Sequence, residues 1–174
     1  MTPMSVNKPY YLISRPFVNG SYTLGGQGQY ITHSNYSKSP NRFIRAFLLL
    51  QKDLQELFEY IEPADGNINS FSFRIHELLL RCCVEIEANF KSILRENGYP
   101  EPEKGRNWNM AEDYLKIYKT HHLDAFQVNL PIWDGTDHHI RKPFFGWTKK
   151  NPPNWYQSYN DTKHDRSDRF HEAN

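Results

Sequence analysis

The sequence lacks the features that mark disulfide-stabilised, secreted and membrane-spanning proteins. Only two of its 174 residues are cysteines, and the neighbours Cys82 and Cys83 cannot form a disulfide framework. No apolar run approaches the roughly 20 residues that cross a bilayer, and residues 1–16 contain no continuous apolar segment of the signal-peptide kind. We therefore expect a cytoplasmic protein without membrane contact, in which both thiols stay reduced and buried.

Net charge is nearly absent as well. The chain has 21 basic and 20 acidic side chains, giving a formal net charge of +1, so it lacks the overall field of a dedicated nucleic-acid coat protein. A local basic patch remains compatible with this balance. Aromatic residues, in contrast, make up 15% of the chain, and we expect Phe, Tyr and Trp to form much of the core.

Residues 1–38 differ in composition from residues 39–174 and predict an N-terminal arm attached to one helical domain. The arm is rich in Tyr, Ser, Asn and Gly, and "VNGSYTLGGQGQYIT" indicates short strands separated by glycine turns. The tract from Gly25 to Gly28 lacks the Gly-Lys-Ser/Thr ending of a phosphate loop, so turns are favoured there over a ligand role.

The first long helix is predicted over residues 40–62. Ser39 is suited to cap it and Pro40 to occupy its first position. Apolar residues then recur at spacings of three and four, at Phe43, Phe47, Leu50, Leu54, Leu57, Phe58 and Ile61. One continuous apolar stripe of this kind indicates a helix of the core.

A second long helix is predicted over residues 70–97, beginning near Ser70 or Ser72 and ending at Asn97-Gly98. Opposite its apolar sector stands a charged row formed by Arg74, Glu77, Arg81 and Glu85. Two interpretations of this row stay open. It is either a solvated ladder of ion pairs, each contributing a few tenths of a kcal/mol, or a charged wall of a cleft that binds substrate.

Between residues 99 and 151 the pattern is mostly irregular. Asn109 and Glu112 match an N-cap and its acidic reach-back residue, which predicts one short helix, and "AFQVNLPIW" suggests a short strand. The segment "RKPFFGWTKKNPPNWY" combines four basic residues with five aromatics. Such a composition could stack against single-stranded nucleic acid, although coverage of a helical core is favoured.

The last helix is predicted to start at Pro152 with Asn151 as its cap. Its buried side is expected to hold Trp155, Tyr159, Thr162, Phe170 and Ala173. A neighbouring polar row holds Tyr156, Asn160, Lys163, His164 and Ser167, with His171 a further turn along. This row contains an Asn and a His one helical turn apart, an arrangement that suits either a small active site or the polar edge of a packing surface.

The remaining motifs narrow the chemistry. No histidines have zinc-ligand spacing and no Ser lies in a Gly-x-Ser-x-Gly turn, so we expect neither a metal, a cofactor nor a serine nucleophile. Any catalysis would be acid–base chemistry by His164, assisted by Asn160, Lys163 and a carboxylate, which suits cleavage of RNA without metal. The alternative is that His164 hydrogen-bonds Asn160 and orients the helix.

Two segments together carry a family resemblance. "FRIHELLLRCCVEIEANFK" and "WYQSYNDTKHDR" resemble a group of bacterial helical proteins whose last helix reads Tyr-Asn-x-x-Lys-His-x-Arg after a Trp-Tyr or Trp-Trp pair. That group resembles the HEPN superfamily, helical bundles common in toxin–antitoxin and antiphage systems. The resemblance, over about residues 40 to 174, implies a metal-independent ribonuclease that acts as a dimer, with the site formed across the interface.

In this resemblance His164 matches the signature histidine and Asn160 matches the polar position that often follows the signature arginine. The arginine itself has no counterpart, because Gln157, Ser158 and Tyr159 stand at its positions. Lys163 and Arg166 are the two candidates to replace the arginine in its contact with phosphate.

Together these patterns predict a mainly α fold, a HEPN-like antiparallel helical bundle with a minor β arm. We expect a homodimer or a complex with a partner protein. One functional hypothesis is a ribonuclease of the toxin or defence type, with His164, Asn160, Lys163 and Arg166 as catalytic residues. Its RNA would contact Arg74, Arg81, Glu85 and Tyr156, with His164 at the edge of a cleft facing the charged row. The other hypothesis is a non-catalytic helical interaction module, such as a subunit of a defence complex.

Overall fold

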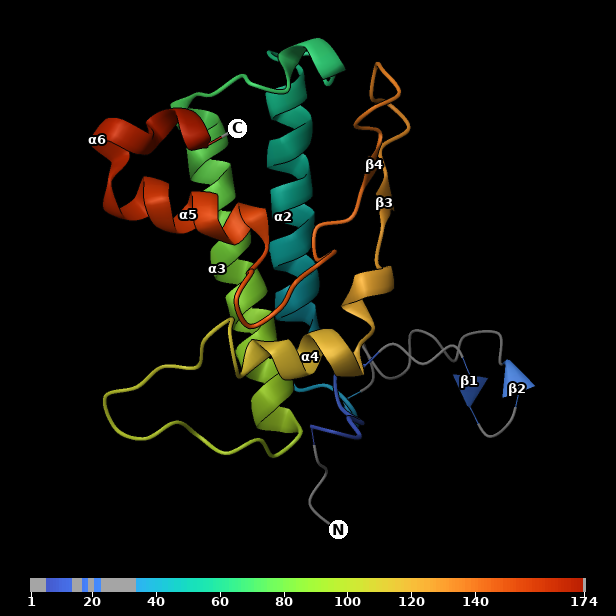
Figure 1. Cartoon of the computed structure of the whole chain (residues 1–174). Helices are drawn as coiled ribbons and strands as arrows, with labels where there is room; N and C mark the ends of the chain where they lie inside the picture. The colour runs from blue at the N-terminus through green and yellow to red at the C-terminus, as the bar shows by residue number, and fades with distance from the viewer. Residues whose placement is uncertain (1–5, 14–16, 19–20, 23–33, 174) are drawn as a thin grey trace.

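The computed structural model describes residues 6–13, 17–18, 21–22 and 34–173, and the fold of these residues is mainly α-helical, as predicted (Figure 1). Its two longest helices, α2 (Pro40–Phe58) and α3 (Phe73–Glu96), lie side by side and antiparallel. A 3₁₀ turn, η1 (Asp65–Asn67), lies in the connection between them. No helix in the described part of the chain is long and apolar enough to span a membrane.

Shorter elements follow α3 and pack around it. Helix α4 (Tyr114–Thr120) leads through η2 (Leu123–Ala125) to an antiparallel hairpin of β3 (Val128–Asn129) and β4 (Ile140–Arg141). The chain then crosses to α5 (Asn154–His164), α6 (Arg166–Arg169) and η3 (Phe170–Glu172). In the arm, β1 (Phe17–Val18) pairs with β2 (Ser21–Tyr22), which is the minor β structure predicted there. The glycine tract from Gly25 to Gly28 lies outside the described residues.

The observed ends of the two long helices agree only in part with the ends predicted from the sequence. Ser72 caps α3, because its hydroxyl accepts a hydrogen bond from the Ile75 amide at 3.2 Å, and Gly98 follows the helix with φ of 73°. Ser39 does not cap α2 through its side chain, since its own backbone is left-handed, with φ of 52°. Helix α2 also ends at Phe58, before the predicted residue 62, because the amides of Glu59 and Tyr60 bond to carbonyls three residues back and tighten the last turn.

The predicted capping pair at the start of α4, Asn109 with Glu112, is correct for Asn109 and displaced by one residue for the carboxylate. Asn109 Oδ1 accepts from the Glu112 amide at 3.0 Å, as expected of a cap. The carboxylate that reaches back to the Asn109 amide, also at 3.0 Å, belongs to Asp113 rather than Glu112. Helix α4 accordingly begins one residue after Asp113, at Tyr114.

The last predicted helix is wrong at its start and in its length. Asn151 does not cap it, because its amide donates to Thr148 in a turn and α5 begins only at Asn154. The helix then breaks at Asp165, where φ is −135° and ψ is 57°, so α5 and α6 are separate. The break redirects the chain while leaving Tyr159, Thr162 and Ala173 buried, three of the five residues expected on the buried side.

The core lies on the carboxyl half of α3 and not between the two long helices. Its buried residues are Val6, Phe90, Leu94, Trp108, Met110, Tyr114, Ile117, Phe144 and Trp147. None comes from α2, whose 19 residues include no buried side chain, so the prediction that this is a core helix is wrong. The preference for the aromatic segment as a cover is confirmed for Phe144 and Trp147, whereas the intervening Phe145 is exposed.

Asn97 joins the N-terminal arm to the end of α3. Its side chain is fully buried, and Oδ1 accepts from the amides of Tyr10 at 2.8 Å and Tyr11 at 3.0 Å. Nδ2 donates to the carbonyls of Tyr11 and Ile93, both at 2.9 Å. One side-chain amide thus satisfies four backbone groups, three of which belong to a segment more than eighty residues away in sequence.

We expect Asn97→Ala to lower the free energy of unfolding by about 1–3 kcal/mol, because buried backbone groups lose their partners. It should also release residues 6–13, which hydrogen exchange at the Tyr10 and Tyr11 amides would detect. Asn107→Ala, in an exposed loop position, is the matched control and should change stability by less than about 0.5 kcal/mol. Unchanged exchange at both tyrosines would contradict this role for Asn97.

Candidate functional site

The polar row on α5 begins with an amide that bonds to its own helix. Asn160 Nδ2 donates to the Tyr156 carbonyl at 2.9 Å, one turn back. His164 is the last residue of α5 and is exposed, and its ring has no hydrogen-bond partner in the described part of the chain. Asn160 therefore does not orient His164, so the packing role considered for this pair has no contact to support it.

Lys163 of the row interacts with Tyr159, which lies on the buried side of α5. Lys163 Nζ donates to the Tyr159 hydroxyl at 3.1 Å, and this bond raises the pKa of the lysine. Burial raises the pKa of Tyr156, and the Glu87 carboxylate of α3 acts in the same direction. This part of α5 thus presents a charged lysine beside a tyrosine hydroxyl, and an exposed imidazole at His164. Of Arg166, the fourth predicted catalytic residue, the side chain lies outside the described residues.

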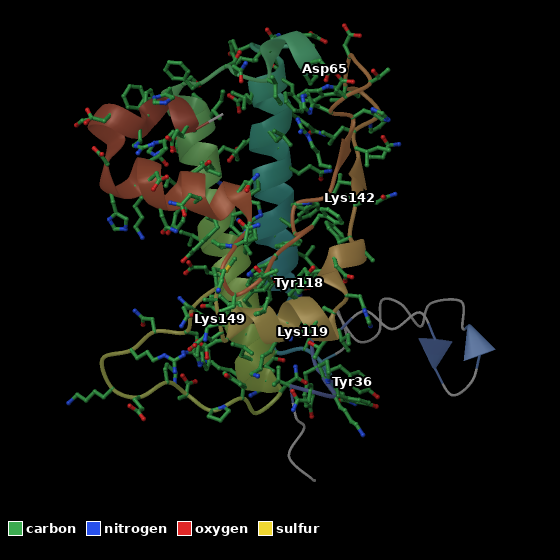
Figure 2. All side chains as sticks on the ribbon, in the orientation of Figure 1. Tyr36, Asp65, Tyr118, Lys119, Lys142 and Lys149 are labelled. Atoms are coloured by element: carbon green, nitrogen blue, oxygen red, sulfur yellow. The ribbon has the colours of Figure 1, made fainter. Side chains whose placement is uncertain are left out.

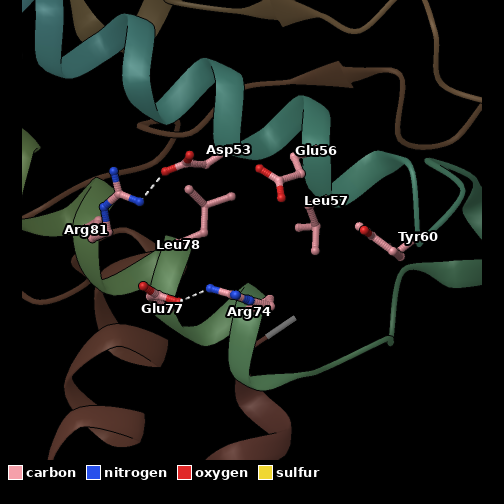
Figure 3. Close-up of a pocket in the computed structure, with 8 residues that line it drawn as sticks. All are labelled: Asp53, Glu56, Leu57, Tyr60, Arg74, Glu77, Leu78 and Arg81. Carbon is pink, nitrogen blue, oxygen red and sulfur yellow. Dashed lines mark hydrogen bonds and ion pairs between the residues drawn. The ribbon is translucent and has the colours of Figure 1, made fainter.

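The predicted charged row on α3 lines a small cleft between α2 and α3. Figure 3 shows Arg81 paired with Asp53 of α2, and Arg74 paired with Glu77 at 3.0 Å. The cleft has a volume of about 280 Å³ and its charged lining is Asp53, Glu56, Arg74, Glu77 and Arg81. Three carboxylates against two guanidiniums give it a net negative charge, which disfavours phosphate. Glu85 lies outside it, beside Leu49 and Val84.

His164 was expected to face this charged row, but the helix that carries it packs on another side of α3. Arg81 faces α2, whereas α5 packs on the side of α3 that carries Glu87, the carboxylate that acts on Tyr156 and Lys163. At about 100° per residue these two sides of α3 are roughly 120° apart. The carboxyl end of α5 also points away from α2 (Figure 1).

Both cysteine thiols have raised pKa values, and no candidate metal site is found among the described residues. Burial raises the pKa of both thiols, to about 12 for Cys83, so little thiolate forms near neutral pH. Within residues 6–13 and 34–173, no three His, Cys, Asp or Glu side chains are grouped closely enough to hold a metal ion.

A larger groove, in which part of the basic and aromatic segment 141–156 takes part, lies at the carboxyl end of α2. It has a volume of about 750 Å³, and its walls come from α2, the connection to α3, the β3–β4 hairpin and the start of α5. Two cations lie over aromatic rings here: Arg141 over Trp133 at 5.3 Å and Lys142 over Phe145 at 5.8 Å. The only signal in the sequence was the mixture of basic and aromatic residues from 141 onward.

Asp65 holds the hairpin against the rest of the groove; Figure 2 labels it near the hairpin tip. Its carboxylate accepts from Trp133 Nε1 at 2.8 Å and from the Asp137 amide at 3.1 Å, and the indole bond is the main reason its pKa is lowered. Gly135 has φ of 130°, and a Cβ at this position would overlap the Asp65 carboxylate. The close approach of the hairpin backbone to Asp65 thus requires glycine.

Comparison with protein-family models, with curated proteins and with solved structures found no match. The resemblance to the HEPN superfamily therefore remains a hypothesis drawn from two sequence segments. Of the three surfaces described, the α5 row carries the predicted proton-transfer residue, the α2–α3 cleft carries a net negative charge, and the groove combines cations with aromatic rings.

The position of Trp133 should depend on pH through Asp65. Because the pKa of Asp65 in the folded protein lies below its ordinary value of 3.8, its bond to Trp133 is complete above that pH and is lost as pH falls further. We expect Trp133 fluorescence, obtained by subtracting the signal of Trp133→Phe, to be constant from neutral pH to about pH 4 and to change below it. Asp65→Asn and Gly135→Ala should each change that signal already at neutral pH, and unaltered emission in both variants would refute the contact.

Proposed function

We propose that this protein is a helical interaction module that self-associates through the outer face of α2. The observation that carries the proposal is that α2 has the apolar spacing of a core helix and yet no buried residue. Leu48 and Leu49 remain 54% and 47% exposed. Adjacent exposed apolar side chains of this size are typical of interaction surfaces.

The charges of α2 favour an antiparallel partner. Its amino-terminal half carries Arg42 and Arg45 and no acid, whereas its carboxyl-terminal half carries Asp53 and Glu56 with one base, Lys52. No acid lies in the first turn and no base in the last. This distribution runs against the helix dipole, which favours acids at the start and bases at the end. A second α2 in antiparallel orientation would offset that cost.

The α2 helix of a second copy carries the charges that such an antiparallel partner needs. Arg42 and Glu56 each lie seven residues from Leu49, on the same side of α2 at about 100° per residue. Antiparallel pairing of two α2 helices about Leu49 would place Arg42 opposite Glu56 of the partner subunit, and the reverse, as two-fold symmetry requires. Val84 of α3, which is exposed and lines the same shallow depression as Leu49, would extend the apolar centre of this interface.

Charge reversals on α2 test the proposal, because they act in opposite directions on folding and on association. Arg42→Glu and Glu56→Arg should each weaken self-association about tenfold, since attraction becomes repulsion twice per dimer. Each should also leave the helix as stable or slightly more so, because the new charge suits the dipole. The double reversal should restore association. Sedimentation equilibrium gives the first quantity and thermal unfolding of the monomer the second.

Lys104→Glu is the matched control, a charge reversal in an exposed loop of the described chain, and should leave association unchanged. Leu48→Lys should weaken association as the charge reversals do. A wild-type protein that remains monomeric at high concentration, or a double reversal that fails to restore association, would reject the second copy as the partner.

A metal-independent ribonuclease is the second candidate, favoured by the exposed imidazole of His164 beside the charged Lys163. In this mechanism the imidazole removes the proton from the 2′-hydroxyl, whose oxygen attacks the phosphorus. The bond from phosphorus to the 5′-oxygen breaks, the leaving oxygen takes a proton from water, and a cation stabilises the negative charge of the transition state. The missing arginine and the separation of His164 from Arg74 and Arg81 make this candidate weaker than the interaction module.

If this second candidate holds, His164→Ala should abolish RNA cleavage while changing the free energy of unfolding by less than about 0.5 kcal/mol, because the side chain is exposed. His171→Ala, at an exposed position in η3, is the control and should cleave as the wild type does. If purified wild-type protein cleaves no RNA, either as a monomer or as a dimer, the ribonuclease candidate is excluded. This result would not affect the interaction module.

A further inference from the structure

We infer that the groove at the carboxyl end of α2 binds a short segment of single-stranded nucleic acid, with Phe145 as a stacking platform and Arg141 and Lys142 as phosphate contacts. This inference does not rest on self-association. Arg42, Leu49 and Glu56, which carry the proposed pairing of two α2 helices, do not line the groove. The inference also does not use His164, which lies at the opposite end of α5, about 15 Å along the axis from Asn154.

Charge is the first argument for this occupant. The charged lining of the groove consists of Glu62, Arg141 and Lys142, a net positive charge, in contrast to the α2–α3 cleft. Among the described residues neither Arg141 nor Lys142 forms an ion pair with a carboxylate, since Arg141 bonds to His138 Nδ1 at 3.0 Å instead. Residues 141–155 contain no acid, and the ion pair of Lys149 with Glu112, at 2.6 Å, lies outside the groove. Cations without carboxylate partners are available to neutralise phosphates.

The aromatic residues of the groove are the second argument. Phe145 is 72% exposed although its neighbour Phe144 is buried, so its ring is open to a nucleobase. Trp133 is fixed through Nε1 to Asp65, and the Arg141 guanidinium lies over its face. The groove thus offers one open ring for stacking and one cation held in place by a second ring. Nucleobases stack on such rings without regard to sequence.

Unpaired amides complete the argument for nucleic acid over protein. Asn69, Asn151 and Asn154 line the groove, and within the described chain their side chains have no hydrogen-bond partner. An amide both donates and accepts, which suits the edges of bases. The volume of about 750 Å³ lies in the usual range of ligand sites, about 300–1,000 Å³. An acidic peptide would use the cations but would leave these amides and the open ring without matching groups.

The test is fluorescence anisotropy with labelled oligothymidine DNA and oligouridine RNA, at several salt concentrations. We expect both strands to bind, and the comparison of the two identifies the sugar preferred. Phe145→Ala should weaken binding about fivefold or more, because a stacking platform is lost. Lys142→Gln should reduce the slope of log affinity against log salt by about 0.7, as expected for one phosphate contact to a single strand.

Two variants serve as controls. Phe73→Ala removes an aromatic ring of similar exposure from α3, and Lys104→Gln removes a distant exposed base; neither should alter binding. Both groove variants change exposed side chains, and unchanged thermal unfolding would establish that they are folded. The inference is overturned if neither oligonucleotide binds, if Phe145→Ala and Lys142→Gln bind as the wild type does, or if a peptide of alternating Glu and Leu binds more tightly than both strands.

Discussion

The packing of Phe90 against Trp147 is the interaction on which the rest of the fold depends. The two rings stack with centroids 6.1 Å apart, and Phe90 also contacts Tyr114 of α4 and Phe144. One residue of α3 thereby holds together α3, α4 and the irregular segment that leads into α5. Because aromatic side chains bury so much area, this cluster can stabilise a core in which few regular elements meet.

This location of the core explains why α2 is left with so little burial. The aromatic segment and α4 cover the carboxyl half of α3, whereas α2 packs against another side of α3, where its apolar stripe is half-buried apart from the exposed Phe47. The same arrangement separates the two surfaces for which we propose partners. The outer face of α2 matches a second copy in charge, while the groove beyond its carboxyl end matches a polyanion.

Asp65 fixes the β3–β4 hairpin to the connection between α2 and α3. It lies just after α2, receives Trp133 and Asp137 from the hairpin, and requires Gly135 for their close approach. The position of the Arg141 cation in the groove therefore depends on a contact between residues 68 positions apart. Lys142 and Phe145, the other two groups proposed to contact a ligand in this groove, are exposed.

The sequence by itself determined the helices and most of their local ends, because apolar spacing, the Ser72 cap and the Gly98 stop act within a few residues. It also separated Tyr159 and Thr162, which are buried, from the polar row of α5. Only the tertiary structure decided which apolar stripe would be covered, which of the adjacent Phe144 and Phe145 would enter the core, and that the Arg74–Arg81 row would face α2 and not His164. The physical reason is competition: segments distant in sequence contend for the same face of α3, and the outcome depends on packing, which no local pattern records.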